Sequence, residues 1–162
     1  MKKLTVKAGQ GFSTPRFQPF AISPRIISID FMLSDASDYE ATQDDWYKLG
    51  GLSTSLIPDK NAAMWGIRCV HGIWELTPYL NKDKRRIHCY DVIRLEKRVM
   101  YQAQIVRTGN EATFELWRYD RLIFQLPLEF NWSWFIFVRQ FYAGGDSFPL
   151  NSFSLDYNLS II

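Results

Sequence analysis

The clearest alternation of apolar and polar residues runs over residues 101–126. Tyrosine, alanine and isoleucine alternate with glutamine at its start, and the alternation resumes on either side of Phe114. Turns are expected at Thr108-Gly109-Asn110 and at Tyr119-Asp120. A period of two predicts half-buried strands, and short Gly/Asn or Asp turns between such runs predict hairpins. We therefore predict three antiparallel strands in a row, which is a scaffold shared by many functions.

The remaining apolar runs are short and regularly spaced, and they predict seven more strands. These are expected at Arg25–Leu33, Trp46–Leu52, Ala62–Val70, Ile73–Leu80, Ile87–Leu95, Trp134–Tyr142 and Ser152–Ile162. Almost no segment shows the 3.6-residue period of an amphipathic helix. The pattern predicts an all-β protein made of two packed antiparallel sheets.

The first 24 residues carry five glycines and prolines that interrupt any long element. We expect residues 1–24 to form an extended N-terminal arm and residues 25–162 to form a single β-sandwich domain. A chain of 162 residues with 47% apolar residues is long enough to bury one sizeable core. The chain shows no internal repeat or linker that would mark a further boundary.

Composition supports the all-β prediction and narrows the partners. Aromatic residues make up 16% of the chain, and aromatic side chains favour pleated, half-buried surfaces. The formal net charge of +2 is too small to indicate a nucleic-acid partner. The one dense basic run, Lys82-Asp83-Lys84-Arg85-Arg86, is predicted to be a solvated hairpin loop.

The N-terminal sequence MKKLTVKAGQGF does not match a secretion signal, because Lys7 interrupts the apolar segment and no small-residue cleavage site follows. No run approaches the roughly 20 apolar residues that cross a bilayer. We expect no membrane partner. The expected location is the cytoplasm, or a virus particle that leaves the cell by lysis.

The four thiol and imidazole side chains do not predict a metal centre. Cys69 and Cys89 could pair, but free thiols on strands are the favoured interpretation. The spacing of His71 and His88 relative to these cysteines matches no tetrahedral ligand pattern. Isolated glycine pairs do not form a phosphate loop either. We predict no metal and no cofactor.

The order of motifs resembles concanavalin-like jelly rolls, and it is most similar to polysaccharide lyases that act on alginate and glucuronan. Residues 48–52 (KLGGL) echo the K-G-G-K-L-P-G-L-like strand of those enzymes, without its second lysine and its proline. Gly72, Glu75 and Tyr79 keep the spacing of the G-x-x-E-x-x-x-Y pattern. Residues 141–145 (FYAGG) and the final strand match the C-terminal motifs. The resemblance covers roughly residues 46–162 and implies a concanavalin-like jelly roll with a concave sheet.

The resemblance also implies a candidate site on that sheet. Elimination from a uronate needs a cation that neutralises the carboxylate, a base and an acid. If the protein is a lyase, the resemblance implies that Lys48, Arg68 and Tyr79 are catalytic, although Met64-Trp65 lies three residues too early for the family's M-W-R motif. The candidate ligand-binding residues are Trp65, Arg68, Glu75, Thr77, Tyr79, Arg139 and Tyr142.

Strand parity places Glu75, Thr77 and Tyr79 on one face. The alternative, which we favour, is structural. Arg68 and Arg139 would pair with Glu75 or Glu115, and the tyrosines would be rim aromatics.

No suitably spaced carboxylate pair indicates a glycosidase. Three other classes of function remain open. The first is a uronate lyase. The second is a glycan-binding sheet on which Trp46, Tyr47, Trp65 or Trp117 stacks against sugar rings. The third is a structural or attachment component.

We predict the third class: a non-catalytic component of a larger assembly, such as a bacteriophage virion, with glycan binding on the concave sheet as a secondary possibility and the lyase as the alternative. Protein partners are expected to contact residues 1–24 and the acidic loop at residues 35–45, and the chain is expected to be a homo-oligomer.

Overall fold

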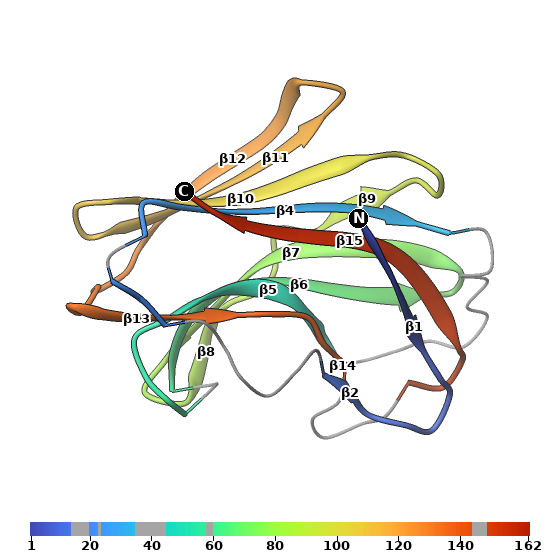
Figure 1. Ribbon diagram of the computed structural model, residues 1–162, viewed down its shortest axis with the longest axis horizontal. Coiled ribbons are helices and arrows are strands. Elements are labelled where there is room, and N and C mark those ends of the chain that lie inside the picture. Colours follow the sequence, from blue (N-terminus) through green and yellow to red (C-terminus); the bar gives the residue numbers. More distant parts are fainter. Residues whose placement is uncertain (14–19, 23, 35–44, 58–59, 144–148) are drawn as a thin grey trace.

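The computed structural model describes residues 1–13, 20–22, 24–34, 45–57, 60–143 and 149–162, and the regular elements in these ranges are strands. Figure 1 shows them arranged in two layers. In chain order the strands are β1 (Lys2–Val6), β2 (Phe12–Ser13), β3 (Phe20–Ile22), β4 (Ile26–Leu33), β5 (Tyr47–Ser53), β6 (Asn61–Val70), β7 (Ile73–Lys82), β8 (Arg85–His88), β9 (Ile93–Leu95), β10 (Tyr101–Thr108), β11 (Glu111–Arg118), β12 (Arg121–Glu129), β13 (Phe135–Arg139), β14 (Tyr142–Ala143) and β15 (Phe153–Ile161).

The two layers are a six-stranded sheet and a nine-stranded sheet. The six-stranded sheet has the order β1-β15-β4-β10-β11-β12. The nine-stranded sheet has the order β2-β14-β5-β6-β7-β8, with β13 beside β5 and β3, and with β9 beside β7. All the described strand pairs are antiparallel. The predicted fold class, an all-β two-sheet jelly-roll sandwich, is confirmed.

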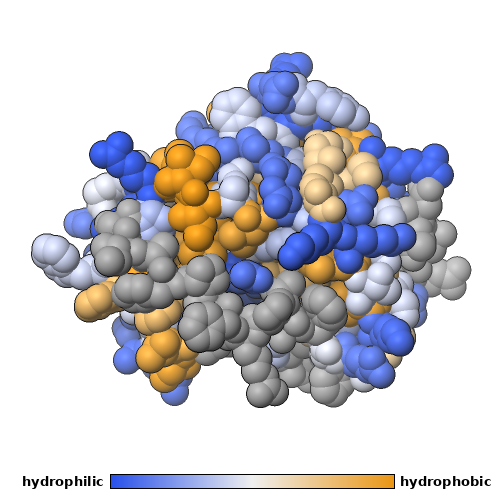
Figure 2. Space-filling model, viewed as in Figure 1, coloured by the Kyte–Doolittle hydropathy of each residue, from blue (hydrophilic) through white to orange (hydrophobic). Residues whose placement is uncertain are grey.

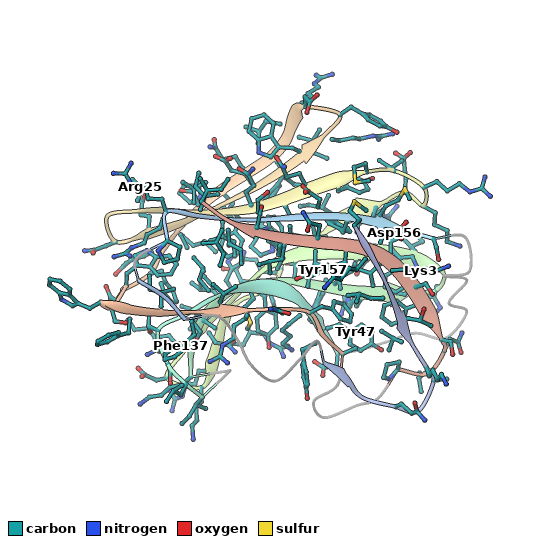
Figure 3. The ribbon with its side chains drawn as sticks, viewed as in Figure 1. Lys3, Arg25, Tyr47, Phe137, Asp156 and Tyr157 are labelled. Carbon is teal, nitrogen blue, oxygen red and sulfur yellow. The ribbon has the colours of Figure 1, made fainter. Side chains whose placement is uncertain are left out.

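Aromatic side chains fill the space between the sheets. The Trp65 ring meets the Phe114 ring edge-on at 5.2 Å between centroids, and its Nε1 donates a hydrogen bond to the Gln104 carbonyl at 3.0 Å. Tyr47 and Tyr157, labelled in Figure 3, also lie between the layers. Burying an aromatic side chain of this size stabilises the fold by about 2–3 kcal/mol. Aromatic residues are therefore a large part of the core between the sheets.

The predicted meander is confirmed in full. Tyr101 pairs with Arg118 in the β10–β11 hairpin, and Glu111 pairs with Glu129 in the β11–β12 hairpin. Asp120 adopts a positive φ of 60°, as a tight hairpin turn requires. In Figure 1 this second hairpin rises away from the rest of the six-stranded sheet, and a register shift between Leu116 and Trp117 accompanies the bend.

Two of the other predicted strands are broken in two. The strand expected at residues 87–95 is divided into β8 and β9, and the strand expected at residues 134–142 is divided into β13 and β14. In both cases the pieces pair separately: β8 and β9 with different parts of β7, and β13 and β14 with different parts of β5. The apolar content predicted an extended chain correctly but could not show where pairing stops.

The described part of the predicted N-terminal arm belongs to the sandwich. Strand β1 pairs with β15, with Lys3 opposite Asp156 as labelled in Figure 3. Strand β2 pairs with β14, and β3 pairs with β13. Leu4 and Val6 are buried, and this short alternation was hidden by the glycines and prolines that follow. Of the predicted acidic loop, residues 35–44 lie outside the described residues, as does the glycine pair at 144–145.

The surface is mixed. Figure 2 shows apolar side chains in separate patches, with charged and polar ones between them. The basic run at residues 82–86 is exposed, as predicted, and extends from the end of β7 through the turn into the start of β8. Within the described residues, no helix is long and apolar enough to cross a membrane.

Candidate functional site

Most of the predicted site residues lie together on the outer face of the nine-stranded sheet, the face turned away from the core. In the β6–β7 hairpin, Arg68 pairs with Glu75, Gly66 with Thr77, and Met64 with Tyr79. Residues opposite each other in an antiparallel pair point to the same side. The prediction that residues 75, 77 and 79 share a face with Arg68 is therefore confirmed. Lys48 joins this face from β5, opposite Gly66, and Tyr142 of β14 lies opposite Lys48.

Arg68 is held by an acid and an aromatic ring. Its Nε donates a hydrogen bond to Glu75 Oε2 at 2.9 Å, and its guanidinium lies 4.2 Å from the centroid of the Trp46 ring. The Arg68 and Glu75 side chains are 25% and 15% exposed. The structural alternative, in which Arg68 pairs with Glu75 across the sheet, is confirmed. The cation is therefore compensated within the protein.

Tyr79 lies between two cations and is 3% exposed. The Lys48 ammonium is 4.5 Å from its ring centroid, and the Arg86 guanidinium is 4.8 Å from it. Arg86 Nε also donates a hydrogen bond to the Tyr79 hydroxyl at 3.0 Å. Burial opposes the charged form of Arg86, but its contacts with the Tyr79 hydroxyl and the Cys89 thiol raise the pKa of the guanidinium above its usual range.

The remaining cation of the set, Lys48, is also engaged. Its Nζ donates a hydrogen bond to the Trp46 carbonyl at 2.6 Å. The three side chains that the lyase resemblance implies as catalytic, Lys48, Arg68 and Tyr79, thus lie near one another. Each of them already has partners in the protein.

Two further predicted residues are buried. Thr77 is fully buried, and its hydroxyl donates to the Pro78 carbonyl at 3.3 Å. Arg139 is 7% exposed and donates to the Ser53 hydroxyl at 3.4 Å, to the Leu56 carbonyl at 3.1 Å and to the Ser55 carbonyl. Through these contacts Arg139 holds the chain that follows β5.

The last two predicted residues, Tyr142 and Trp65, differ in exposure. Tyr142 is 42% exposed. Trp65 is fully buried and lies on the opposite side of the sheet, against Phe114 of the other layer. The inclusion of Trp65 in the site is therefore corrected, because strand parity turns its ring into the core. The same holds for Tyr47, whose ring stacks on Phe153 in the core.

Sequence reasoning missed Arg86 as a member of this cluster. The basic run was interpreted as a solvated loop, whereas Arg86 lies in β8, directly after the turn. However, Arg86 pairs with Asn81 of β7, which brings its side chain back over the sheet toward Tyr79 and to 3.8 Å from Asp45 Oδ1. The only signal in the sequence that could have placed Arg86 here was the short strand expected to return after the two-residue turn.

Both cysteines are free thiols, as favoured from the sequence. Burial raises the pKa of the Cys69 thiol to about 11. His88 Nε2 lies 2.7 Å from Asp91 Oδ2. Among the described residues, no group of three or more His, Cys, Asp or Glu side chains is placed to hold a metal ion.

No protein-family model matches the sequence. No curated protein matches it either. The fold is similar to the crystal structure of a functionally unknown protein from Saccharomyces cerevisiae, with a TM-score of 0.52 and 10% identity over 99% of this chain and 87% of that chain. A second similar structure is sheep galectin-11 in complex with glycerol, with a TM-score of 0.41 and 9% identity over 91% of this chain and 100% of that chain. At such identities the similarity concerns the fold alone.

Proposed function

We propose that the protein is a non-catalytic structural or attachment component of a larger assembly. The observation that carries this proposal is that the three side chains implied as catalytic are already bound to other groups of the protein. Lys48, Arg68 and Tyr79 are bound to a backbone carbonyl, to a carboxylate and to a second guanidinium, respectively. Side chains that satisfy one another in this way stabilise a sheet surface without needing a substrate.

A uronate lyase is the alternative, and the same contacts disfavour it. A tyrosine that moves a proton must come within hydrogen-bond reach of the substrate, and Tyr79 is 3% exposed. A cation that neutralises a substrate carboxylate must be available to it, and Arg68 already binds Glu75. Incubation with alginate and polyglucuronate, followed by the ultraviolet absorbance of unsaturated uronate, tests the alternative. We expect no product, and product formation that is lost in Tyr79→Phe would overturn the proposal.

An edge strand supports the assembly part of the proposal. Strand β12 is the last strand of the six-stranded sheet and, within the described residues, pairs only with β11. Its sequence, RLIFQLPLE, is largely apolar, and Leu122 and Ile123 are 37% and 43% exposed. A long apolar edge strand presents unpaired backbone groups that favour pairing with another strand. We therefore propose β12 as the contact with a second copy of the chain.

A two-fold contact fits this edge. Two β12 strands that pair antiparallel about Gln125 would use the same surface on both copies, so that the contact closes on itself. Pro127 cannot donate to β11, and its nitrogen must therefore face the free edge. Each copy then lacks one backbone hydrogen bond at Pro127, which limits the strength of the contact. The apolar side chains around Gln125 would supply the rest.

The size of the native form tests the assembly proposal. Gel filtration or sedimentation of undenatured extract from the native source should give a particle far larger than the 19.0 kDa chain. The purified chain alone should associate through β12 only. A native form that runs as a free monomer would contradict the proposal.

A further inference from the structure

A second surface, on the outer face of the six-stranded sheet, has the features of a binding site. Around Trp117 there is a hollow of about 350 Å³, lined by Asp30, Met100, Gln102, Trp117, Tyr119 and Asp120. Its volume is within the range of small-molecule sites, roughly 300–1,000 Å³. The lining residues come from β4, from β10 and the residue that precedes it, from β11 and from the turn after β11, so that separate segments converge on one place.

Polar side chains next to the hollow are held in fixed orientations by one another. The Gln102 amide donates to Asp30 Oδ1 at 3.0 Å, and the Gln104 amide donates to Gln102 Oε1 at 2.9 Å. On the other side of Asp30, the Asn158 amide donates to Oδ2 at 3.4 Å. This network crosses β15, β4 and β10. Groups held in this way lose little conformational entropy when a ligand binds.

The Trp117 ring is similarly fixed. Its Nε1 donates to Glu115 Oε2 at 3.2 Å, and Glu115 Oε1 accepts from the Gln125 amide at 3.0 Å. Trp117 lies directly opposite Gln102 in the β10–β11 pair. An oriented aromatic ring therefore stands beside amide and carboxylate groups. Tyr119, which is 68% exposed, adds a second aromatic ring at the border of the hollow.

We infer that this hollow binds a neutral glycan, with a sugar ring packed against Trp117 and its hydroxyls bound by Asp30 and Gln102. An indole face is an apolar platform that suits the C–H face of a pyranose. A carboxylate accepts about four hydrogen bonds, so Asp30 keeps acceptor capacity beyond the two amides that it already binds. The six lining residues include two carboxylates and no cation, which disfavours a uronate polymer.

The inference rests on the proposed attachment role, since a sugar that is held without being cleaved is one way to attach. The attachment role and the glycan site at Trp117 can fail separately. Release of an unsaturated product would overturn the non-catalytic role. A lack of neutral-glycan binding without any product would overturn the Trp117 site alone.

The test is a printed array of neutral glucan, mannan and galactan oligosaccharides together with alginate and polyglucuronate oligosaccharides. Binding to at least one neutral series is expected, followed by titration of that oligosaccharide with the wild type and variants. Trp117→Ala should weaken binding by about tenfold or more, equivalent to about 1.4 kcal/mol. Trp117→Phe should retain part of the affinity. Asp30→Asn keeps the shape of the side chain and should nevertheless weaken binding.

Trp134→Ala is the matched control, because Trp134 is 87% exposed and precedes β13 in the other sheet. It should change the affinity by less than about twofold. The inference is overturned if no neutral series binds, if only the uronates bind, or if Trp117→Ala and Asp30→Asn, checked for native thermal unfolding, bind as the wild type does.

Discussion

Arg86 lies with its guanidinium over the Tyr79 ring and donates to the hydroxyl of the same residue. A residue that follows the β7–β8 turn thus packs against a ring in the second half of β7, and Lys48 of β5, on the other side of β6, covers the same ring. From this arrangement we infer a structural role for Tyr79. Its loss should therefore be measured as stability rather than as catalysis.

We expect Tyr79→Phe to lower the free energy of unfolding by about 1.5 kcal/mol, because one hydrogen bond from a charged donor is lost while the ring stays. Tyr79→Ala should cost about 3 kcal/mol or more, because it also empties buried volume. Urea denaturation measures both values. Tyr142→Phe is the control, since Tyr142 is 42% exposed, and it should leave stability nearly unchanged. Equal effects at the two tyrosines would contradict this role.

The glycine at position 51 is predicted to be irreplaceable for a steric reason. A Cβ at Gly51 would lie 2.2 Å from the Ala63 carbonyl oxygen and 2.5 Å from the Met64 Cα, both of which are backbone atoms. Gly51→Ala should therefore prevent β5 from pairing closely with β6, with a cost of several kcal/mol or a failure to fold.

Gly109→Ala is the comparison for that experiment. Gly109 has a φ of +56° with no atom within 4 Å of a Cβ, so only backbone strain of about 1 kcal/mol is expected. Thermal unfolding of the two variants measures the difference. A Gly51→Ala protein as stable as Gly109→Ala would show that β5 and β6 are not this close.

The two thiols should differ in reactivity. Cys69 is fully buried and Cys89 is partly exposed, and burial raises the Cys69 pKa to about 11. A thiolate is the reactive form, so a thiol reagent at neutral pH should label Cys89 in the native protein and both cysteines only after unfolding. Mass spectrometry of the labelled peptides gives the site. Rapid native labelling of Cys69 would contradict its burial.

The raised Cys69 pKa also predicts a loss of stability at alkaline pH. The unfolded thiol ionises near its usual value of 9.0, whereas the folded thiol stays protonated up to about 11. The stabilising contribution is therefore complete below pH 9 and is lost as pH rises toward 11, to a total of about 2–3 kcal/mol. Cys69→Ala should show a flatter dependence over this range. If the free energy of unfolding falls equally with pH in the wild type and in Cys69→Ala, Cys69 is not the cause of the alkaline loss of stability.

The proposed β12 contact predicts a covalent dimer. In an antiparallel pair centred on Gln125, the two Cα atoms at this position would lie about 5.5 Å apart, which is within the range of a disulfide. In a background where Cys89 is serine, Gln125→Cys should cross-link on oxidation. Glu115→Cys is the control because β11 lies one strand further from the edge, and it should not cross-link.

A charge at the same edge should break the contact. Ile123→Lys places an ammonium group where Ile123 is 43% exposed, and lysine on an edge strand disfavours pairing. Sedimentation should show that this variant is more monomeric than the wild type at equal concentration. A wild-type chain that is already monomeric, or a variant that associates equally well, would exclude β12 as the interface.

The meander and most of the strands could be predicted from the sequence because their alternation is local. Strand parity also correctly predicted that Glu75, Thr77 and Tyr79 share one face of the sheet, the face on which Arg68 lies. Parity would also have placed Trp65 in the core, because it alternates with Met64 and Gly66 of the outer face, but the lyase-like motif suggested the wrong face. Arg86 and the breaks in two strands depended on pairings between segments, which residue patterns do not contain.

Sedimentation of undenatured extract from the native source, beside the purified chain, tests the proposed role most directly. If the protein is a component of a larger assembly, the native form should sediment far ahead of the purified chain, and the wild-type purified chain should sediment ahead of Ile123→Lys. If the native form and the purified chain both sediment as a 19.0 kDa monomer, the assembly role is wrong.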